Sequence, residues 1–138
     1  MVAVAAAALA GYVWGVANFQ REHDRHRLRK EAQRIEAAIR AGHPAAAWLP
    51  AEGSPRSRVP AREQARRDAV LRDFERLARL KGFSLVGLEV EVAQEQGLAR
   101  FHVIGNDVDR RLPPARGEWL FERGPSGWQL VGSRLFDR

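Results

Sequence analysis

His102 is the residue of this 138-residue sequence best suited to acid–base chemistry. It lies in an alternating segment that predicts a β-strand, and a strand histidine can exchange a proton when a carboxylate lies within hydrogen-bond distance. The carboxylates on or beside neighbouring predicted strands are Glu89, Glu91, Asp107 and Glu118. The alternation also sets His102 opposite Phe101 and Val103, so an exposed, non-catalytic position is the alternative. No nucleophile elbow, phosphate-binding glycine loop or dinucleotide fingerprint accompanies it.

Four further residues are candidates for lining a ligand pocket. They lie on predicted strands and are Phe101, Trp119, Trp128 and Arg134. Strict alternation places Arg134 on the same face as Trp128, Leu130 and Phe136. It is then either an inward charge or a charge that guards an edge strand against pairing with other chains.

The sequence predicts neither a metal site nor a cofactor. It contains no Cys, which excludes disulfides and thiolate ligands. His23 and His26 have a spacing that suits a metal on a helix, with Asp24 beside them. Five basic residues within one or two turns oppose a bound cation, so a solvated histidine pair is the preferred interpretation.

The net charge of +6 is carried almost wholly by Arg, on two predicted helical stretches at 20–41 and 54–81. A basic helix can lie along phosphates through long-range attraction. Acidic side chains offset almost half of the charge on the second stretch, and no aromatic residues interleave with the basic ones to stack on bases. A nucleic-acid partner is therefore not expected.

The first twenty residues are predicted to be a transmembrane anchor. No charged residue occurs from Val2 to Phe19, which meets the lower length limit for a membrane-spanning helix. Trp14 and Phe19 precede Arg21 and Arg25, as aromatic and basic residues do at a membrane interface. A cleaved signal peptide and a buried soluble helix are the alternatives, and lipid is the expected partner of the anchor.

Small residues recur every four positions within this anchor. They are Ala3, Ala7, Gly11 and Gly15, and such a stripe lets a second membrane helix approach closely, either in a homodimer or in another subunit. The basic residues that follow predict a single-pass protein with its soluble domain in the cytoplasm. A longer N-terminus with its own Arg or Lys would reverse this orientation and make the domain extracytoplasmic.

Residues 21–138 are predicted to form one α+β domain. Apolar residues at helical spacing predict helices over 21–41, ended by Gly42 and Pro44, and over 61–81, capped by Gly82. Residues 50–60 contain three Pro and predict an irregular loop. After Gly82 the apolar period falls to two, which predicts four antiparallel strands with a hairpin turn at 124–127.

Two stretches of this domain resemble the NTF2-like superfamily, also called SnoaL-like or cystatin-like. They are "RIEAAIRAGHPAAAWLP" in the first helix and "GEWLFERGPSGWQLVGSRLFDR" at the C-terminus. The resemblance implies two helices packed on a curved four-stranded antiparallel sheet, which together form a cone. The short hairpin that many members carry before the long helix has too little room in residues 50–60.

Together these features predict a membrane-anchored NTF2-like interaction module. It would be a non-catalytic accessory subunit of a larger membrane assembly, a layout that membrane-anchored subunits of secretion machines share. The alternative is a SnoaL-like protein or enzyme that binds a small ligand in the cone. Fold analogy alone does not decide between the two.

Overall fold

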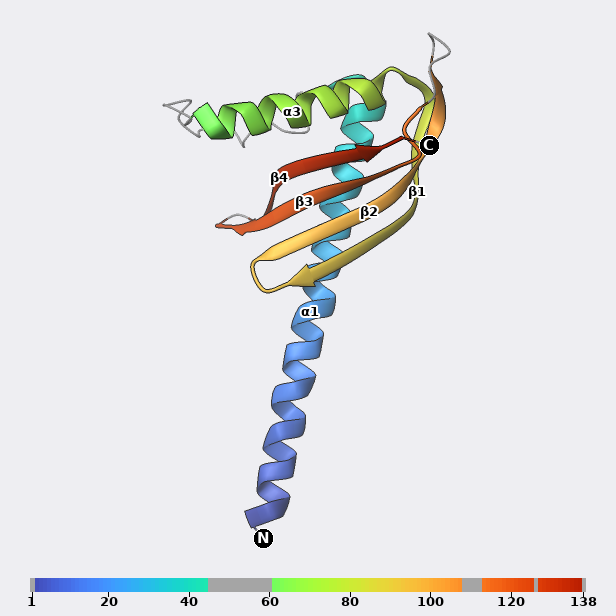
Figure 1. Cartoon of the computed structure of the whole chain (residues 1–138). Helices are drawn as coiled ribbons and strands as arrows, with labels where there is room; N and C mark the ends of the chain where they lie inside the picture. The colour runs from blue at the N-terminus through green and yellow to red at the C-terminus, as the bar shows by residue number, and fades with distance from the viewer. Residues whose placement is uncertain (1, 45–60, 108–112, 126, 138) are drawn as a thin grey trace.

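The protein is described by a computed structural model over residues 2–44, 61–107, 113–125 and 127–137, with only the backbone described for 2–18 and 61–63. Two long helices and a four-stranded sheet make up this part of the chain (Figure 1). The elements are α1 (Val2–Arg40), α3 (Ala61–Ala78), β1 (Leu80–Ala93), β2 (Gln96–Asp107), β3 (Arg116–Gly124) and β4 (Gly127–Phe136). This confirms the predicted α+β class.

Helix α1 runs without a break from the apolar N-terminal segment into the domain. No Gly or Pro interrupts it between Val16 and Ala41. It ends as predicted, because Gly42 adopts the left-handed conformation at φ 81°. The His43 N–H then donates to the Ala38 carbonyl, and the Gly42 N–H to the Ile39 carbonyl, the paired bonds of a Schellman cap.

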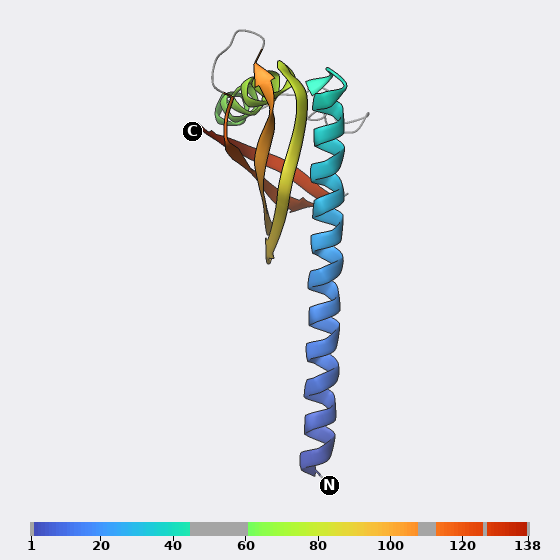
Figure 2. The same cartoon turned by 90° about the vertical axis from the view of Figure 1, so that its right-hand side faces the viewer.

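The second half of α1 supplies one wall of the core. Leu28, Ala32, Ile35 and Ile39 are 0–1% exposed and lie at spacings of three and four, so they form one stripe against the sheet. The first half of the helix extends beyond the sheet and packs on no other element in either view (Figures 1 and 2). One helix is therefore both a core element and a projecting rod.

Helix α3 is shorter than predicted and its cap was misassigned. The helix ends at Ala78, and the chain enters β1 at Leu80. Gly82 lies inside β1 with φ 67°, at an irregularity between Lys81 and Ser84. Because Leu80 and Phe83 are both buried on either side of it, packing extends the strand where local sequence favoured a helix.

The strands form an antiparallel meander in the order β1-β2-β3-β4. The predicted turn at 124–127 joins β3 and β4. A bulge in β4 pairs Leu120 with Gly132 but Phe121 with Leu130, which leaves Val131 as an extra residue. The alternation of β4 reverses at this bulge. Strict alternation predicted that Arg134 shares a face with Trp128 and Leu130, and this prediction is wrong, because Arg134 lies on the opposite face.

The sheet has an inner face that packs on the helices and an outer face turned away from α1 (Figure 2). Three aromatic rings fill the centre of the inner side, with Trp119 at 4.6 Å from the Phe101 ring and 5.7 Å from the Phe74 ring. All three are buried. The cone predicted from the resemblance is thus closed at its centre by aromatic packing.

Several expectations concern parts of the chain outside the described residues. The irregular loop at 50–60 lies there, as do the side chains of Ala3, Ala7, Gly11, Trp14 and Gly15. In the part of the chain whose side chains are described, which begins at Phe19 in α1, no helix has the length and apolarity needed to cross a membrane.

Replacing Gly117 with Ala should destabilise the domain by about 1–3 kcal/mol, the usual cost of overpacking a core. A Cβ there would lie 2.5 Å from the Phe101 ring. Chemical denaturation of the full-length protein in mild detergent measures the change. Gly132→Ala is the matched control on the neighbouring strand, because its Cβ meets only the flexible Leu120 side chain at 3.1 Å. Equal effects of the two substitutions would contradict this packing.

Candidate functional site

An open groove of about 430 Å³ lies between α3 and β4. Helix α3 contributes Val70 and Arg66, and β4 contributes Ser133 and Arg134. Phe121 closes the groove from β3. Glu122 lines the groove as well. The groove thus combines an apolar floor with two basic side chains and one acidic one, a composition that suits a small, partly apolar ligand.

Two buried polar atoms beside this groove lack hydrogen-bond partners among the described residues. They are the Trp119 indole Nε1 and the Ser133 hydroxyl. The two residues face each other across β3 and β4. Buried polar groups are almost always paired, so an unpaired couple favours a site that water or a ligand completes.

Asp73 on α3 adds a carboxyl group to this couple. Partial burial raises the pKa of Asp73, and an interaction with the Ser133 hydroxyl opposes that rise without forming a well-aligned hydrogen bond. Raised carboxyl pKa values are common where proton exchange or ligand binding occurs. The trio of Asp73, Trp119 and Ser133 can present two donors and one carboxyl group to a polar atom.

The predicted pocket residues are not assembled into one site. Phe101 and Trp119 meet in the core, and Phe101 also contributes to the lining of the depression beside His102. Trp128 is partly buried at the far end of β4, where the Arg123 guanidinium lies 4.8 Å from its ring. Arg134 does line the α3–β4 groove.

His102 lies on the outer face, exposed and away from Trp119 and Asp73. Its surroundings form a shallow depression of about 160 Å³ that also involves Arg100, Arg116 and Glu118. The structure therefore places it in the exposed position that the alternation offered as the alternative. Among the described residues, no three His, Asp or Glu side chains gather closely enough to hold a metal ion.

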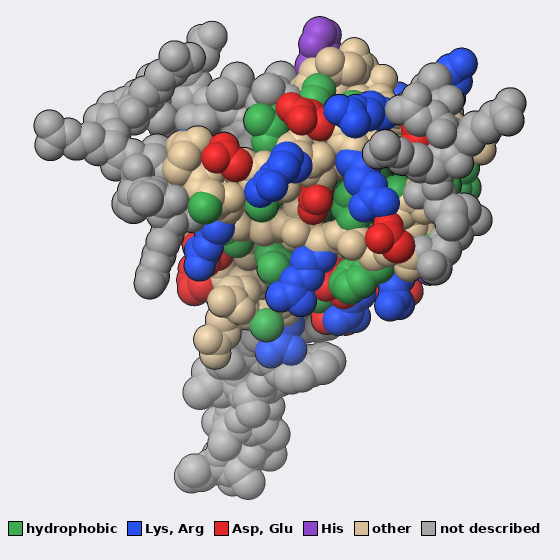
Figure 3. Space-filling model, turned by 45° about the horizontal axis from the view of Figure 1, so that its top comes forward, with side chains coloured by type: hydrophobic (Ala, Val, Ile, Leu, Met, Phe, Trp, Pro, Cys, Tyr) green, Lys and Arg blue, Asp and Glu red, His purple; other side chains and the backbone are tan. Residues whose placement is uncertain are grey.

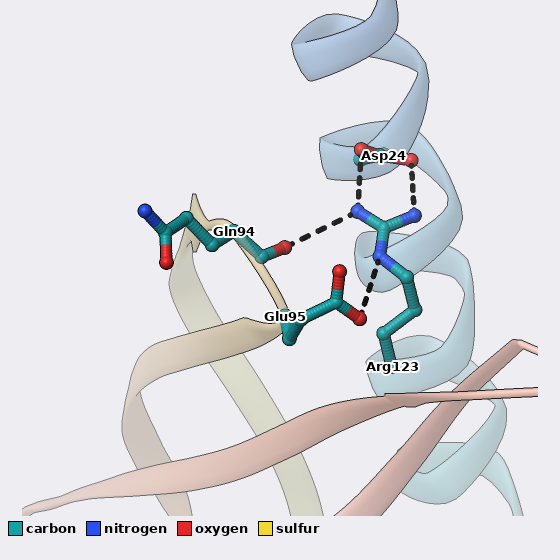
Figure 4. Close-up of polar contacts among 4 residues, drawn as sticks. All are labelled: Asp24, Gln94, Glu95 and Arg123. Atoms are coloured by element: carbon teal, nitrogen blue, oxygen red, sulfur yellow. Dashed lines mark hydrogen bonds and ion pairs between the residues drawn. The ribbon is translucent and has the colours of Figure 1, made fainter.

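A partly buried ion pair, in which Asp24 is buried and Arg123 is about one third exposed, fixes α1 to the sheet at the point where the helix leaves the domain (Figure 4). The Arg123 guanidinium donates two hydrogen bonds to the Asp24 carboxylate, at 3.2 and 2.7 Å. Arg123 also donates to the Gln94 carbonyl and lies 3.7 Å from Glu95. The hydrogen bond from Arg123 lowers the pKa of Asp24, although burial opposes the shift.

Charges of both signs are interspersed over the side of the molecule that carries α3. Figure 3 shows Lys and Arg side chains alternating with Asp and Glu, and apolar side chains exposed between them. A continuous basic surface, which phosphate-backbone binding requires, is not seen on this side.

Sequence reasoning considered Asp24 only beside the histidine pair and missed its ion pair, and it missed Asp73 altogether. Asp24 lies four residues before Leu28, so it continues the apolar stripe of α1, and a carboxylate at a core position needs a partner. Asp73 precedes the buried Phe74 and gave no comparable signal. Its environment depends on Ser133, whose position follows from the bulge at Val131.

Comparisons with known proteins show the fold. No protein-family model matches the sequence, and no curated protein sequence does either. A crystal structure from Streptomyces avermitilis, named as a proposed dehydratase of the NTF2-like family, superposes with a TM-score of 0.56 at 16% identity, covering 85% of this chain and 97% of that one.

Two structures from Novosphingobium aromaticivorans agree with it. One is an NTF2-like protein with a cystatin-like fold, at a TM-score of 0.55 and 19% identity, covering 88% of this chain and 86% of that one. The name of the other proposes an aromatic ring hydroxylase. It superposes with a TM-score of 0.53 at 15% identity, covering 83% of this chain and 89% of that one. The domain therefore has the NTF2-like fold, as its resemblance predicted, and identities this low show the fold alone.

Replacing Asp24 with Asn should destabilise the fold by about 1 kcal/mol at neutral pH, because the ion pair loses its negative member while solvent screens the partly exposed Arg123. Because the pKa of Asp24 is lowered in the folded state, its carboxylate stabilises the fold fully at pH values well above the unfolded-state pKa of about 3.9. This stabilisation is lost as the pH falls through the folded-state pKa. The gap between wild type and Asp24→Asn should therefore narrow in acid. Denaturation at several pH values measures it, with the exposed Glu75→Gln as control. A gap that is constant with pH would contradict the role assigned to the ion pair.

Proposed function

We propose that the chain is a membrane-tethered NTF2-like module that serves as an accessory subunit of a membrane assembly. The observation that carries this proposal is the single helix α1. Its second half is a core element through Leu28, Ile35 and Ile39, and its first half projects away from the domain. The projecting half coincides with the uncharged run from Val2 to Phe19.

The contact between Asp24 and Arg123 supports a rigid tether rather than a flexible one. It lies one turn and a half beyond Phe19, whose side chain is 71% exposed. A helix fixed to the sheet so close to the membrane would hold the domain at a defined height and orientation. Such positioning suits a subunit of an assembly, and the positive-inside rule favours the cytoplasmic side.

The filled core supports a binding role over catalysis. Phe74, Phe101 and Trp119 occupy the centre of the cone, where a deep pocket would otherwise lie. The α3–β4 groove is open to solvent. Interaction through exposed faces is then the function that this geometry favours.

Introducing Arg at Leu9 should release the protein from membranes. A charge near the middle of a spanning helix costs about 2.5–3.5 kcal/mol, and an Ala-rich segment has little apolarity to offset it. Alkaline extraction of membranes from expressing cells measures the effect. Wild type and the control Gln20→Arg should stay in the pellet, while Leu9→Arg should move to the supernatant. Release of the wild-type protein would refute the tether.

A small-ligand-binding function is the second candidate, favoured by the unpaired Trp119 Nε1 and Ser133 hydroxyl beside the groove. The names of two structural neighbours propose a dehydratase and an aromatic ring hydroxylase. A ligand of this kind would place a polar atom on the Ser133 hydroxyl, which lines the groove directly in front of Trp119, and its apolar body against Val70 and Phe121. Arg66 and Arg134 would then favour an acidic substituent.

Asp73→Asn should be at least as stable as wild type at neutral pH. Because the pKa of Asp73 is raised in the folded state, its protonated carboxyl group stabilises the fold fully at pH values below the unfolded-state pKa of about 3.9. This stabilisation is lost as the pH rises through the folded-state pKa, so at neutral pH the charged side chain no longer stabilises the fold. Denaturation against pH measures this, with Asp68→Asn on the exposed face of α3 as control. In the same samples, benzoate should shift the Trp119 indole N–H signal in NMR spectra. A destabilised Asp73→Asn together with an unmoved indole signal would dispose of this candidate.

A further inference from the structure

Positive charge on α1 is concentrated directly beyond the uncharged run that ends at Phe19. Glu22 and Asp24 are the acidic residues of the stretch 21–30, and Arg123 from the sheet neutralises Asp24. The basic residues of the same stretch are Arg21, Arg25, Arg27, Arg29 and Lys30. This part of the helix therefore carries a net positive charge within about three turns of Phe19.

The next ten residues of α1 have a balanced charge. Glu31 pairs there with Arg34, and Glu36 pairs with Arg40. In the preceding stretch, by contrast, four basic residues are exposed and form no hydrogen bond or ion pair with any described residue. They are Arg21, Arg25, Arg29 and Lys30. The counter-charge of these four residues therefore comes from outside the chain.

Distance along the helix divides the four residues into a near pair and a far pair. At about 1.5 Å per residue, Arg21 and Arg25 lie about 3 and 9 Å beyond Phe19, whereas Arg29 and Lys30 lie about 15 Å or more beyond it. The headgroup layer of a bilayer is about 5–8 Å thick. Side chains of a helix also lean toward its N-terminus. If Phe19 lies at the edge of the hydrocarbon, only the near pair can touch lipid phosphates.

Phe19 has the properties of a residue at that edge. Its side chain is 71% exposed, and its ring stacks on the ring of His23 with the centroids 6.4 Å apart. Aromatic rings concentrate at the level of the headgroups, next to basic residues. The order of Phe19, Arg21 and Arg25 along α1 matches this arrangement.

The end of the sheet lies just beyond the near pair. Arg123 donates both to Asp24 and to the Gln94 carbonyl, so the β1–β2 turn is level with Asp24. Figures 1 and 2 show this turn as the part of the sheet that reaches furthest toward the N-terminal end of α1. Arg21 precedes Asp24 by three residues and Leu28 by seven, spacings that place it on the sheet side of the helix. Arg21 therefore lies where the space between the domain and a membrane would be.

We propose that this end of the domain binds anionic phospholipid, with Arg21 and Arg25 in direct contact with the lipid phosphate groups. The inference rests on the membrane tether proposed above. Guanidinium groups bind phosphate oxygens through charge-assisted hydrogen bonds. Glu22 and Glu95 are the exposed carboxylates at this end, and the five basic residues outnumber them. An anionic lipid is thus favoured over a zwitterionic one.

The position of the basic residues favours lipid over a soluble polyanion. Arg21 follows the uncharged run by two residues, so a bilayer that holds the run brings its own phosphates to the near pair. The basic residues of α3 lie at the opposite end of the domain and add nothing to this surface (Figures 1 and 2). Because Asp24 and Leu28 fix α1 to the sheet, lipid bound at the near pair would hold the whole domain at one height and tilt.

Phosphatidylglycerol should be enriched around the wild-type protein roughly fivefold over phosphatidylcholine, about the effect of one basic residue near a membrane surface. The double variant Arg21→Gln/Arg25→Gln should lose most of this preference. High salt should weaken the wild-type preference, because the Debye length falls to about 3 Å at 1 M. Gln is a good helix former, so the helix itself should persist.

Energy transfer measures this enrichment in vesicles of phosphatidylcholine with a minor share of phosphatidylglycerol. The donor is a dye on Gln20→Cys of the full-length chain, which has no native Cys. The acceptor is a trace of either lipid labelled on its acyl chain, so that its headgroup is unchanged. Arg72→Gln/Arg79→Gln, which removes the same charge at the far end of the domain, is the matched control and should behave as wild type. Arg29→Gln/Lys30→Gln should lose less of the preference than the near pair does.

Equal enrichment of the two lipids around the wild type, or an unchanged preference in Arg21→Gln/Arg25→Gln, would overturn the proposal. An equal loss in Arg29→Gln/Lys30→Gln would show a diffuse effect of charge and would overturn direct contact by the near pair. Energy transfer to neither lipid would refute the membrane tether itself. The failure of the proposed function is thereby distinguished from the failure of lipid selectivity alone.

Discussion

The structure depends on the burial of one apolar stripe of α1 against the inner face of the sheet. Leu28, Ile35 and Ile39 are fully covered there, and Leu28 reaches so close to Gly97 that no Cβ fits between them. Because α1 has no Gly or Pro between Val16 and Ala41, this stripe also fixes the rotation of the projecting half. A shift or twist of that half is carried directly into the core.

The polar contacts of the domain follow from this packing. Asp24 continues the stripe into the region where the sheet ends, and its carboxylate would be buried alone if Arg123 did not reach it from β3. In the centre of the core, Trp119 packs on Phe74 and Phe101, and its N–H and the Ser133 hydroxyl have no partner among the described residues. One polar group in the core is thus satisfied within the chain, and two are left for water or a ligand.

Local periodicity predicted most of the fold. The stripes of both helices, the Gly42 cap and the turn between Gly124 and Gly127 are all read from short-range spacing, and each is found in the structure. Bulges were not predictable in this way, because an extra residue interrupts the very alternation that identifies a strand. Gly82 was therefore assigned to a helix cap, and Arg134 to the inner face. The candidate site was less predictable still, since Asp73 meets Ser133 only through the bulge in β4.

The most direct test is a scan of nitroxide labels along α1 in lipid vesicles, made simple by the absence of native Cys. Collisions with oxygen report lipid, and collisions with a water-soluble nickel chelate report solvent. If α1 is one continuous helix that lies in lipid at one end and packs on the sheet at the other, labels up to about Phe19 should collide with oxygen. Labels beyond Phe19 should collide with the chelate, and only on the helix face opposite Leu28. Chelate contact throughout residues 2–18 would contradict the tethered rod.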